Sequence, residues 1–306
     1  DAAPRAYLKV ADLEKERGDL NAAYKRYVDF INKYRKGSGA MLVEANSKAG
    51  EVLHDQDKTR NRKRVVRHME TALKLYKKLS DKEKKQARAF VAMAAFYVAQ
   101  YAYYDFSEFK IDAGNFYRLG NTLEKKAKLH QEAEKLFTNV ITIKSRFWAA
   151  AAYYQIGILY HEFAETLYAV PLPEGLSEDE VDMYKIELES RYADPLEEKA
   201  RINFKQAILM AHKLGVYSEW SRKSGKMAAK LTPQDFPIDH EDKVVTDKPK
   251  DTLLSTSFIR SLRRGDTEVD FVKFKGEEQK DDEGGEGDTG TKPEEGKSDA
   301  STESSK

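Results

Sequence analysis

Small and aromatic residues recur at fixed offsets along the first 231 residues, and this recurrence constrains the fold more than any other feature. In one kind of segment, an aromatic residue is followed three positions later by a large apolar residue, then directly by a small residue, and three positions further by a second aromatic. In the other kind, Ala is followed four positions later by an aromatic residue and three beyond by a small or apolar residue. Offsets of three and four place these side chains on one helix face, where small residues let helices approach closely and rings fill the remaining space. The clearest examples are Tyr153, Ile156, Gly157 and Tyr160 for the first kind, and Ala200, Phe204 and Ala207 for the second.

The two kinds of segment alternate four times, which predicts four helix pairs stacked in chain order. We expect the pairs at residues 4–35, 42–79, 86–143 and 146–214, and a terminal helix at 217–231, so that residues 1–236 form one helical repeat domain. The other landmarks are Tyr7, Val10, Ala11, Ala23, Tyr27 and Phe30 in the first unit, Ala49, Gly50, Leu53, Ala72, Tyr76 and Leu79 in the second, and Phe90, Met93, Ala94, Tyr97, Ala133, Phe137 and Val140 in the third.

This order of landmarks resembles the tetratricopeptide repeat (TPR). The resemblance implies an all-α, TPR-like α-solenoid whose groove binds other proteins. A standard repeat places about nine residues between the last landmark of the first helix and the Ala of the second. In the third and fourth units, that separation is 36 and 40 residues. We therefore expect elongated helical hairpins in the second half of the chain, lengthened at the turn between the paired helices.

Residues 170–237 resemble a narrower group, the C-terminal part of envelope TPR proteins of myxobacteria and related bacteria, which includes lipoproteins associated with gliding motility. The resemblance is carried by PLPEGLSEDE, whose Ser177 and Glu180 form an expected capping box, and by ADPLEEKA, GVYSEW and TPQDFP. It implies a periplasmic or outer-membrane-associated adaptor that binds components of an envelope or motility complex. A lipidated Cys upstream of Asp1 would anchor it, although the chain itself contains none. A cytoplasmic location is the alternative.

The composition excludes several classes of function. Lys and Arg (53) nearly balance Asp and Glu (52), so no net charge draws the whole chain to nucleic acid or to a membrane. Without Cys, this stretch has no disulfide and no thiolate chemistry. No apolar run is long enough for a transmembrane segment.

The chain starts with DAAPRAYLKV, which contains neither Met nor an apolar signal region. This start is interpreted as that of a mature or trimmed chain.

His161 and Glu162 open an HE pair, which a zinc-peptidase helix would continue as HExxH. The second imidazole would stand at position 165, because residues four apart share a helix face, but that position holds Glu165. No other two of the six His residues stand three or four apart. We therefore expect no metal, no cofactor and no catalytic residue, with a zinc site assembled from distant parts of the chain as the minor alternative. His161 is interpreted as an exposed or hydrogen-bonded residue of a packing helix.

Three surfaces are candidates for partner binding. Residues 58–88 carry 13 Lys or Arg against 3 acidic residues, which indicates either a solvated face or a site for an acidic partner. Nucleic acid is not expected there, because no aromatic platform for base stacking accompanies the charges. Residues 96–117 hold nine aromatics, of which we expect about two thirds in the core and the rest on an exposed ledge. The expected groove residues are Arg5, Asp12, Lys15, Glu16, Tyr154, Ile158, His161 and Glu162, and the basic face includes Arg60, Arg64 and Arg67.

The composition changes after residue 236. Residues 237–275 are expected to be extended, and the apolar runs within 252–274 would dock on the helices, pair as a hairpin or bind a partner. Residues 276–306 carry 11 acidic and 4 basic side chains and no large apolar one, which predicts a disordered acidic tail. The sequence as a whole predicts a non-catalytic interaction scaffold of a bacterial cell envelope, acting through its groove and long hairpin tips. The alternatives are a binder of an acidic polymer or glycan through the 58–88 face, and a cytosolic TPR adaptor.

Overall fold

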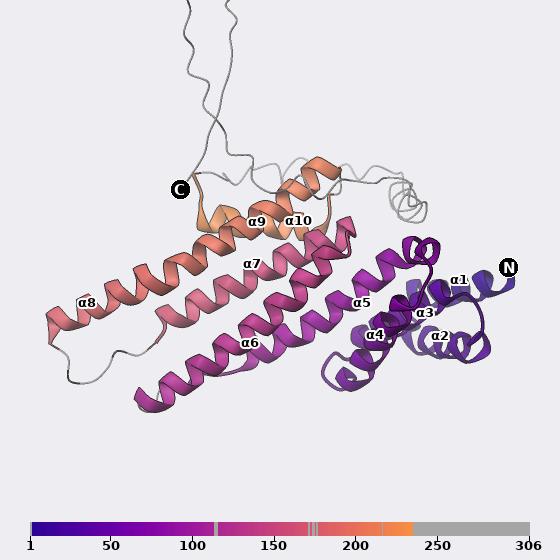
Figure 1. Ribbon diagram of the computed structural model, residues 1–306, viewed down its shortest axis with the longest axis horizontal. Coiled ribbons are helices and arrows are strands. Elements are labelled where there is room, and N and C mark those ends of the chain that lie inside the picture. Colours follow the sequence, from indigo (N-terminus) through magenta and orange to yellow (C-terminus); the bar gives the residue numbers. More distant parts are fainter. Residues whose placement is uncertain are drawn as a thin grey trace, which may run out of the picture. The chain divides into compact units, whose positions relative to one another are not determined.

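The structure of the chain, a computed structural model, describes residues 2–112, 116–170, 172, 175, 177–215 and 217–234. These residues form ten α-helices and one short π-helical segment, and they contain no strand (Figure 1). The predicted all-α class is therefore confirmed. The segments expected to be extended (237–275, with the apolar runs of 252–274) and disordered (276–306) lie outside the described residues.

The helices pair in chain order, and the later pairs are longer than the first. Helices α5 and α6 have 28 and 27 residues, against 15 and 14 in α1 and α2, which confirms the expected elongation. The elements are α1 (Ala2–Glu16), α2 (Leu20–Lys33), α3 (Gly39–Gln56), α4 (Arg62–Lys77), α5 (Asp81–Glu108), α6 (Phe116–Thr142), α7 (Arg146–Tyr168), α8 (Glu178–Leu188), the π-helical η1 (Glu189–Ala193), α9 (Asp194–Leu214) and α10 (Glu219–Leu231).

Side-chain caps and one glycine determine where several helices begin and end. At the start of α8, Ser177 accepts a hydrogen bond from the backbone N–H of Glu180, whose carboxylate accepts one from the N–H of Ser177, as the sequence predicts. Ser80 begins α5 with the same arrangement. Helix α9 ends at Gly215, whose φ of 61° lies in the left-handed region that glycine adopts without steric cost.

Each helix pair packs against the next, so the fold is repeat-like and its core is continuous. Contacts join α2 to α3, α4 to α5 and α6 to α7, while the first helices of successive pairs also meet, α3 with α5 and α5 with α7. Half-buried Leu73 and Ile143 each contact two neighbouring core clusters. All the expected packing residues are buried: Ala11, Ala23, Tyr27, Ala94, Ala133, Phe137, Gly157, Tyr160, Ala200 and Phe204.

Helix α10 packs against both helices of the fourth pair, α7 and α9. None of the described helices is both long and apolar enough to cross a bilayer.

Candidate functional site

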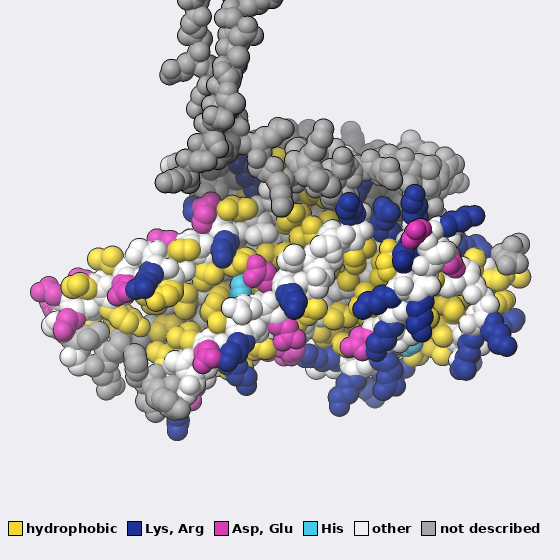
Figure 2. All heavy atoms as spheres, in the orientation of Figure 1, with side chains coloured by type: hydrophobic (Ala, Val, Ile, Leu, Met, Phe, Trp, Pro, Cys, Tyr) yellow, Lys and Arg dark blue, Asp and Glu magenta, His cyan; other side chains and the backbone are white. Residues whose placement is uncertain are grey.

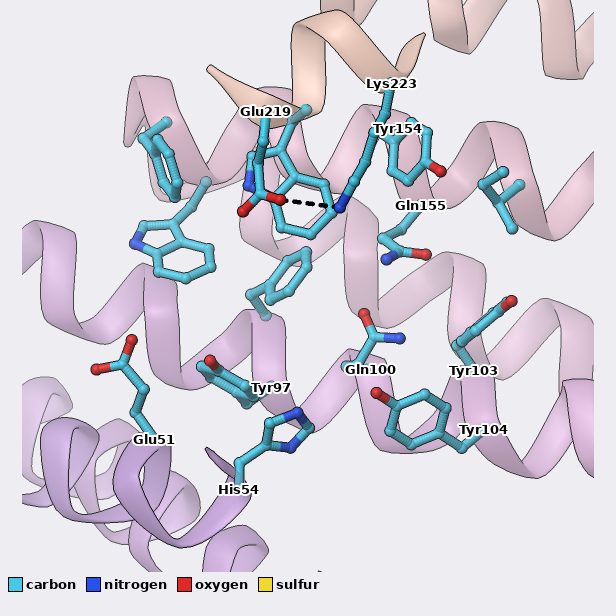
Figure 3. Close-up of a pocket in the computed structure, with 15 residues that line it drawn as sticks. Glu51, His54, Tyr97, Gln100, Tyr103, Tyr104, Tyr154, Gln155, Glu219 and Lys223 are labelled. Atoms are coloured by element: carbon cyan, nitrogen blue, oxygen red, sulfur yellow. Dashed lines mark hydrogen bonds and ion pairs between the residues drawn. The ribbon is translucent and has the colours of Figure 1, made fainter. Parts of the chain in front are cut away.

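A cavity of about 440 Å³ lies where α3, α5, α7 and α10 meet (Figure 3). Its wall is dominated by aromatic rings, and both tryptophans of the chain belong to it. Aromatic walls with a few polar groups are typical of sites that bind a ligand in a preformed cleft. The aromatic residues of the wall are Phe96, Tyr97, Tyr103, Tyr104, Phe147, Trp148, Tyr154 and Trp220.

The helical repeat positions these rings. Tyr97 and Tyr104 stand seven residues apart on α5 and therefore share one helix face. The ring of Phe96 lies between the two tryptophans, with centroid distances of 5.0 Å to Trp148 and 5.6 Å to Trp220. Tyr154 of α7 also contacts Trp220, at 5.6 Å. Because rings from α5, α7 and α10 support one another, the wall is held before any ligand binds.

Polar groups enter the cavity from each of the four helices. Glu219 of α10 binds Lys223 at 2.9 Å, and the Lys223 ammonium lies 4.6 Å from the Trp220 ring centroid. Glu51 of α3 is paired with Lys15 at 2.7 Å. The Gln155 side chain of α7 also lies in the cavity wall, where its amide can hydrogen-bond a ligand (Figure 3).

Burial favours the neutral form of the tyrosine and histidine side chains of the wall. It raises the pKa of the phenols of Tyr97, Tyr103 and Tyr104, with the hydrogen bond from Tyr103 to Glu162 adding to the effect. Burial also lowers the pKa of His54, which lies beside Tyr97. The cavity therefore offers uncharged donors and acceptors between aromatic faces, with charge confined to its carboxylates and one ammonium.

Of the groove residues expected on α7, Tyr154 and Ile158 line the cavity, and Glu162 lies next to it as the acceptor of the Tyr103 hydroxyl. The interpretation of His161 as an exposed groove residue was wrong. His161 is only 7% exposed. Helix α9 packs more extensively against α7 than any other two described helices pack together, and it covers the face that carries His161.

The groove residues expected on α1 are mostly engaged with α3. Arg5 binds Glu44 at 2.6 Å, Asp12 binds Lys48 at 2.7 Å, and Lys15 binds both Glu51 and Asp55. Glu16 is exposed. These ion pairs connect the first two helix pairs, and only Lys15 reaches the cavity wall, through its contact with Glu51.

The expected exposed ledge within residues 96–117 is absent among the described side chains there. The seven aromatics from Phe96 to Phe109 are all buried or half-buried, because the neighbouring helices cover both sides of α5. Half-buried Tyr97, Tyr103 and Tyr104 form part of the cavity wall instead.

Sequence reasoning missed the contributions of α3 and α10. One signal for α3 is available, since Glu51 follows Gly50 directly, just as Ile158 follows Gly157 in the fourth unit. Both residues line the cavity. No repeat landmark falls in α10, so the role of Trp220 has no comparable signal.

The basic face is exposed, as expected both for a solvated face and for a site that binds an acidic partner. Arg60 lies in the turn before α4, and Arg64 and Arg67 lie in the first half of that helix; all three are exposed. Figure 2 shows Lys and Arg side chains gathered over that part of the molecule. Arg64 lies 4.9 Å from the ring centroid of Tyr24.

Among the described residues, one group of His and Glu side chains has the spacing of metal ligands, and it lies outside the cavity, between α7 and α9. Comparison of the chain with known proteins finds no matching family model, no matching curated protein and no matching solved structure.

Proposed function

We propose that this chain is a non-catalytic interaction scaffold that binds a segment of a partner protein in the aromatic cavity. The observation that carries the proposal is the convergence of Trp148, Trp220 and several tyrosines from three helices on one preformed cleft. Tyr and Trp dominate binding energy at protein interfaces because they give a large contact area with little loss of conformational entropy.

The chemistry of the wall favours an extended peptide with apolar or proline side chains. Proline-rich segments are recognised in grooves lined by aromatic rings, where a few donors bind the exposed peptide carbonyls. The amide of Gln155 and the hydroxyls of Tyr104 and Tyr154 are suited to that role.

The extended fourth hairpin offers a second contact for partners. Helix α8 contains no buried residue, and its Met183 and Ile186 are 71% and 64% exposed. Apolar side chains at this exposure support the idea that the hairpin tip binds another protein. The resemblance of residues 170–237 to envelope TPR proteins supports a role in a bacterial cell-envelope assembly, with a cytosolic adaptor as the alternative.

Tryptophan fluorescence tests the proposal directly, because both tryptophans of the chain line the cavity. A panel of proline-rich and apolar peptides is titrated into the full chain. We expect a shift or quenching of the emission, and an affinity at least about tenfold lower for Tyr104→Ala, as for an interface residue worth more than about 1.4 kcal/mol. Tyr192→Ala, on exposed η1, is the matched control. Peptides that bind equally to both variants would exclude the cavity as the site.

The exposed basic face supports a second candidate, a binder of an acidic polymer or glycan. Charge reversal of Arg60, Arg64 and Arg67 distinguishes the two. If heparin binds the chain, and binding is lost both on reversal and in about 0.5 M salt while peptide binding is unchanged, the basic face has a function of its own.

A further inference from the structure

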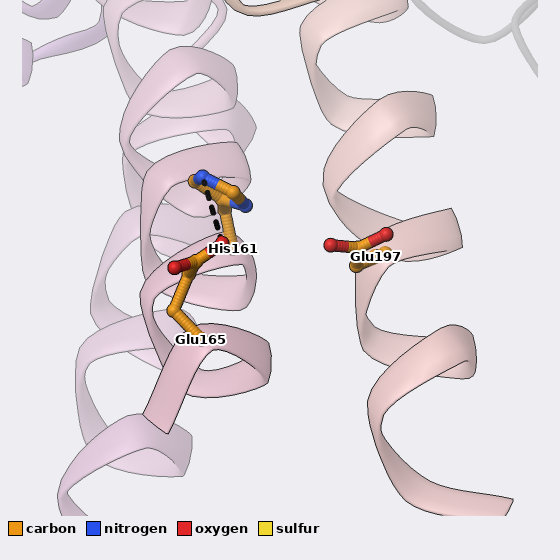
Figure 4. A group of neighbouring side chains, drawn as sticks. All are labelled: His161, Glu165 and Glu197. Atoms are coloured by element: carbon orange, nitrogen blue, oxygen red, sulfur yellow. Dashed lines mark ion pairs between the residues drawn. The ribbon is translucent and has the colours of Figure 1, made fainter. Parts of the chain in front are cut away.

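We infer that His161, Glu165 and Glu197 form a binding site for a divalent transition-metal ion, with Zn²⁺ as the best fit. Each residue offers one ligand atom, and the three atoms lie within 4.8 Å of one another. Figure 4 shows the imidazole and the Glu165 carboxylate on α7, with the Glu197 carboxylate directed toward them from α9. The sequence alone provides only the first two residues, because Glu197 comes from a distant part of the chain.

The helices bring these groups together. His161 and Glu165 are four residues apart on α7 and so project from the same face. Glu197 lies in the first turn of α9, which packs along that face. The spacing is therefore a consequence of the packing of the fourth helix pair.

The imidazole is the strongest indication of a ligand. His161 is 7% exposed, and its buried Nδ1 has no hydrogen-bond partner among the described residues. Its Nε2 lies 4.0 Å from Oε1 of Glu165, which is too long for a hydrogen bond. A buried ring nitrogen without a hydrogen-bond partner is costly, and a metal ion bound to that nitrogen would remove the cost.

The charge of the cluster also favours a cation. No Lys or Arg among the described residues pairs with Glu165 or Glu197, and the Glu197 carboxylate makes no hydrogen bond in that part of the chain. Burial, followed by the charge of Glu197, raises the pKa of the nearby Tyr168 phenol to about 12. A bound cation would offset the negative charge of the two carboxylates, neither of which forms an ion pair with a described Lys or Arg.

The donor set and the spacing indicate the class of metal. Three atoms within 4.8 Å of one another leave a point no more than about 2.8 Å from all of them, and rotation of the two Glu side chains would close this to the roughly 2.0–2.2 Å of Zn–N and Zn–O bonds. An imidazole with two carboxylates suits Zn²⁺ better than Ca²⁺ or Mg²⁺, which prefer oxygen ligands alone. Glu165 is exposed, so an ion can enter from solvent and keep a water ligand there. The bound ion would connect α7 to the start of α9, directly after the π-helical η1.

The test uses the full chain, freed of metal with a chelator and titrated with ZnCl₂ by calorimetry. We expect one Zn²⁺ per chain, and affinities lower by at least about tenfold in Glu165→Gln and in Glu197→Gln, since even the loss of a group supporting a ligand costs roughly that much. Glu187→Gln is the control, because it removes one carboxylate from an exposed i,i+4 pair between α8 and η1. Neither Glu165 nor Glu197 is buried, so these variants should retain the helical circular-dichroism spectrum.

Titration with CoCl₂ assigns the imidazole. We expect visible absorption bands of a low-coordinate Co²⁺ site in the wild-type chain and in Glu187→Gln, and their loss in His161→Gln. Wild-type chain that takes up no Zn²⁺, or a Glu165→Gln/Glu197→Gln double variant that binds it as tightly as the wild type, would overturn the proposal.

Discussion

Gly157 determines how closely α7 and α9 approach. A Cβ atom at this position would lie 2.5 Å from a ring carbon of Phe204, and the aromatic ring has no flexible end that could move aside. Gly50 in the second unit is similarly close to the end of the Met69 side chain, at 2.6 Å, but a thioether adapts easily. A larger side chain is therefore excluded at the glycine of the fourth pair, Gly157, but can be accommodated at the glycine of the second pair, Gly50.

Replacement of Gly157 tests this close approach. We expect Gly157→Ala to lower the free energy of unfolding by about 1–3 kcal/mol, because the added methyl group overpacks the contact with Phe204. Gly120→Ala in α6 is the matched control, since nothing lies within 4 Å of its Cβ position. It should stabilise the chain by about 0.5–1 kcal/mol. Urea unfolding measures both, and equal stabilisation by the two substitutions would contradict the packing of α7 on α9.

His130 makes the stability of the chain dependent on pH. It packs against the rings of Tyr160, Phe163 and Phe106, and its Nε2 has no hydrogen-bond partner among the described residues. Burial, assisted by the charge of Lys199, lowers its pKa from 6.5 to about 4. Between these two pH values the unfolded chain binds the proton more tightly, so the stability contributed by neutral His130 is lost as the pH falls.

We expect His130→Phe to lose less stability than the wild type between pH 7 and pH 5, by about 2 kcal/mol from this one group. Some pH dependence should remain, because burial also lowers the pKa of His54 and of His68. Urea unfolding at the two pH values gives the comparison. Identical losses in the two chains would mean that His130 titrates normally in the folded state.

At the scale of helices, Lys126 of α6 donates hydrogen bonds to backbone carbonyls at the end of α5. Its ammonium group, on α6, donates to the carbonyl oxygens of Phe106 and Phe109 at 2.8 and 3.0 Å, at the end of α5. The last carbonyls of a helix have no partner within it, so this buried side chain satisfies the end of the longest helix. The lengthened hairpin is therefore closed by a contact between its own two helices.

We expect Lys126→Met to destabilise the chain by about 1–3 kcal/mol, because it leaves buried carbonyls unsatisfied. Amide hydrogens in the last two turns of α5 should exchange faster. Lys128→Met is the control, since it removes only an exposed ion pair with Glu124 and should change stability by less than about 0.5 kcal/mol. Hydrogen exchange that is unchanged at the end of α5 would show that Lys126 does not hold it.

Elements whose evidence is local could be predicted from the sequence, and those that depend on distant partners could not. The helix pairs and the capping box at Ser177 follow from spacing along the chain, and so does the position of Tyr154 on the groove side of α7. The burial of His161 could not be predicted, because it depends on α9 lying along α7. Trp220 contacts Phe96 on a helix far away in the sequence, and Lys126 reaches across the turn of its hairpin. Periodicity carries no information about either contact.

At the scale of the whole chain, specific ion pairs add to the apolar packing that connects neighbouring helix pairs. Between the first and second pairs, Lys48 of α3 binds Asp12 of α1 and Glu44 of its own helix, each at 2.7 Å. Arg5 binds the same Glu44, which is almost completely buried, and Tyr27 donates its hydroxyl to Asp12. Since each pair contacts mainly its neighbours, loss of this network should affect the first pairs before the later ones.

Substitution of Lys48 tests whether the first helix pairs can open separately from the later ones. We expect Lys48→Met to destabilise the packing of α1 on α3 by about 3–5 kcal/mol, because buried Glu44 and half-buried Asp12 would keep their charges with incomplete compensation. Hydrogen exchange should then accelerate in α1 and α2 while protection in α5, α7 and α9 is maintained. Glu44→Gln in the Lys48→Met background removes one of the uncompensated charges and should restore part of the lost protection. An equal loss of protection from α1 to α9 would instead mean that the helix pairs unfold as one cooperative unit, and that the first pairs cannot open separately from the half of the chain that contains α7 and α10.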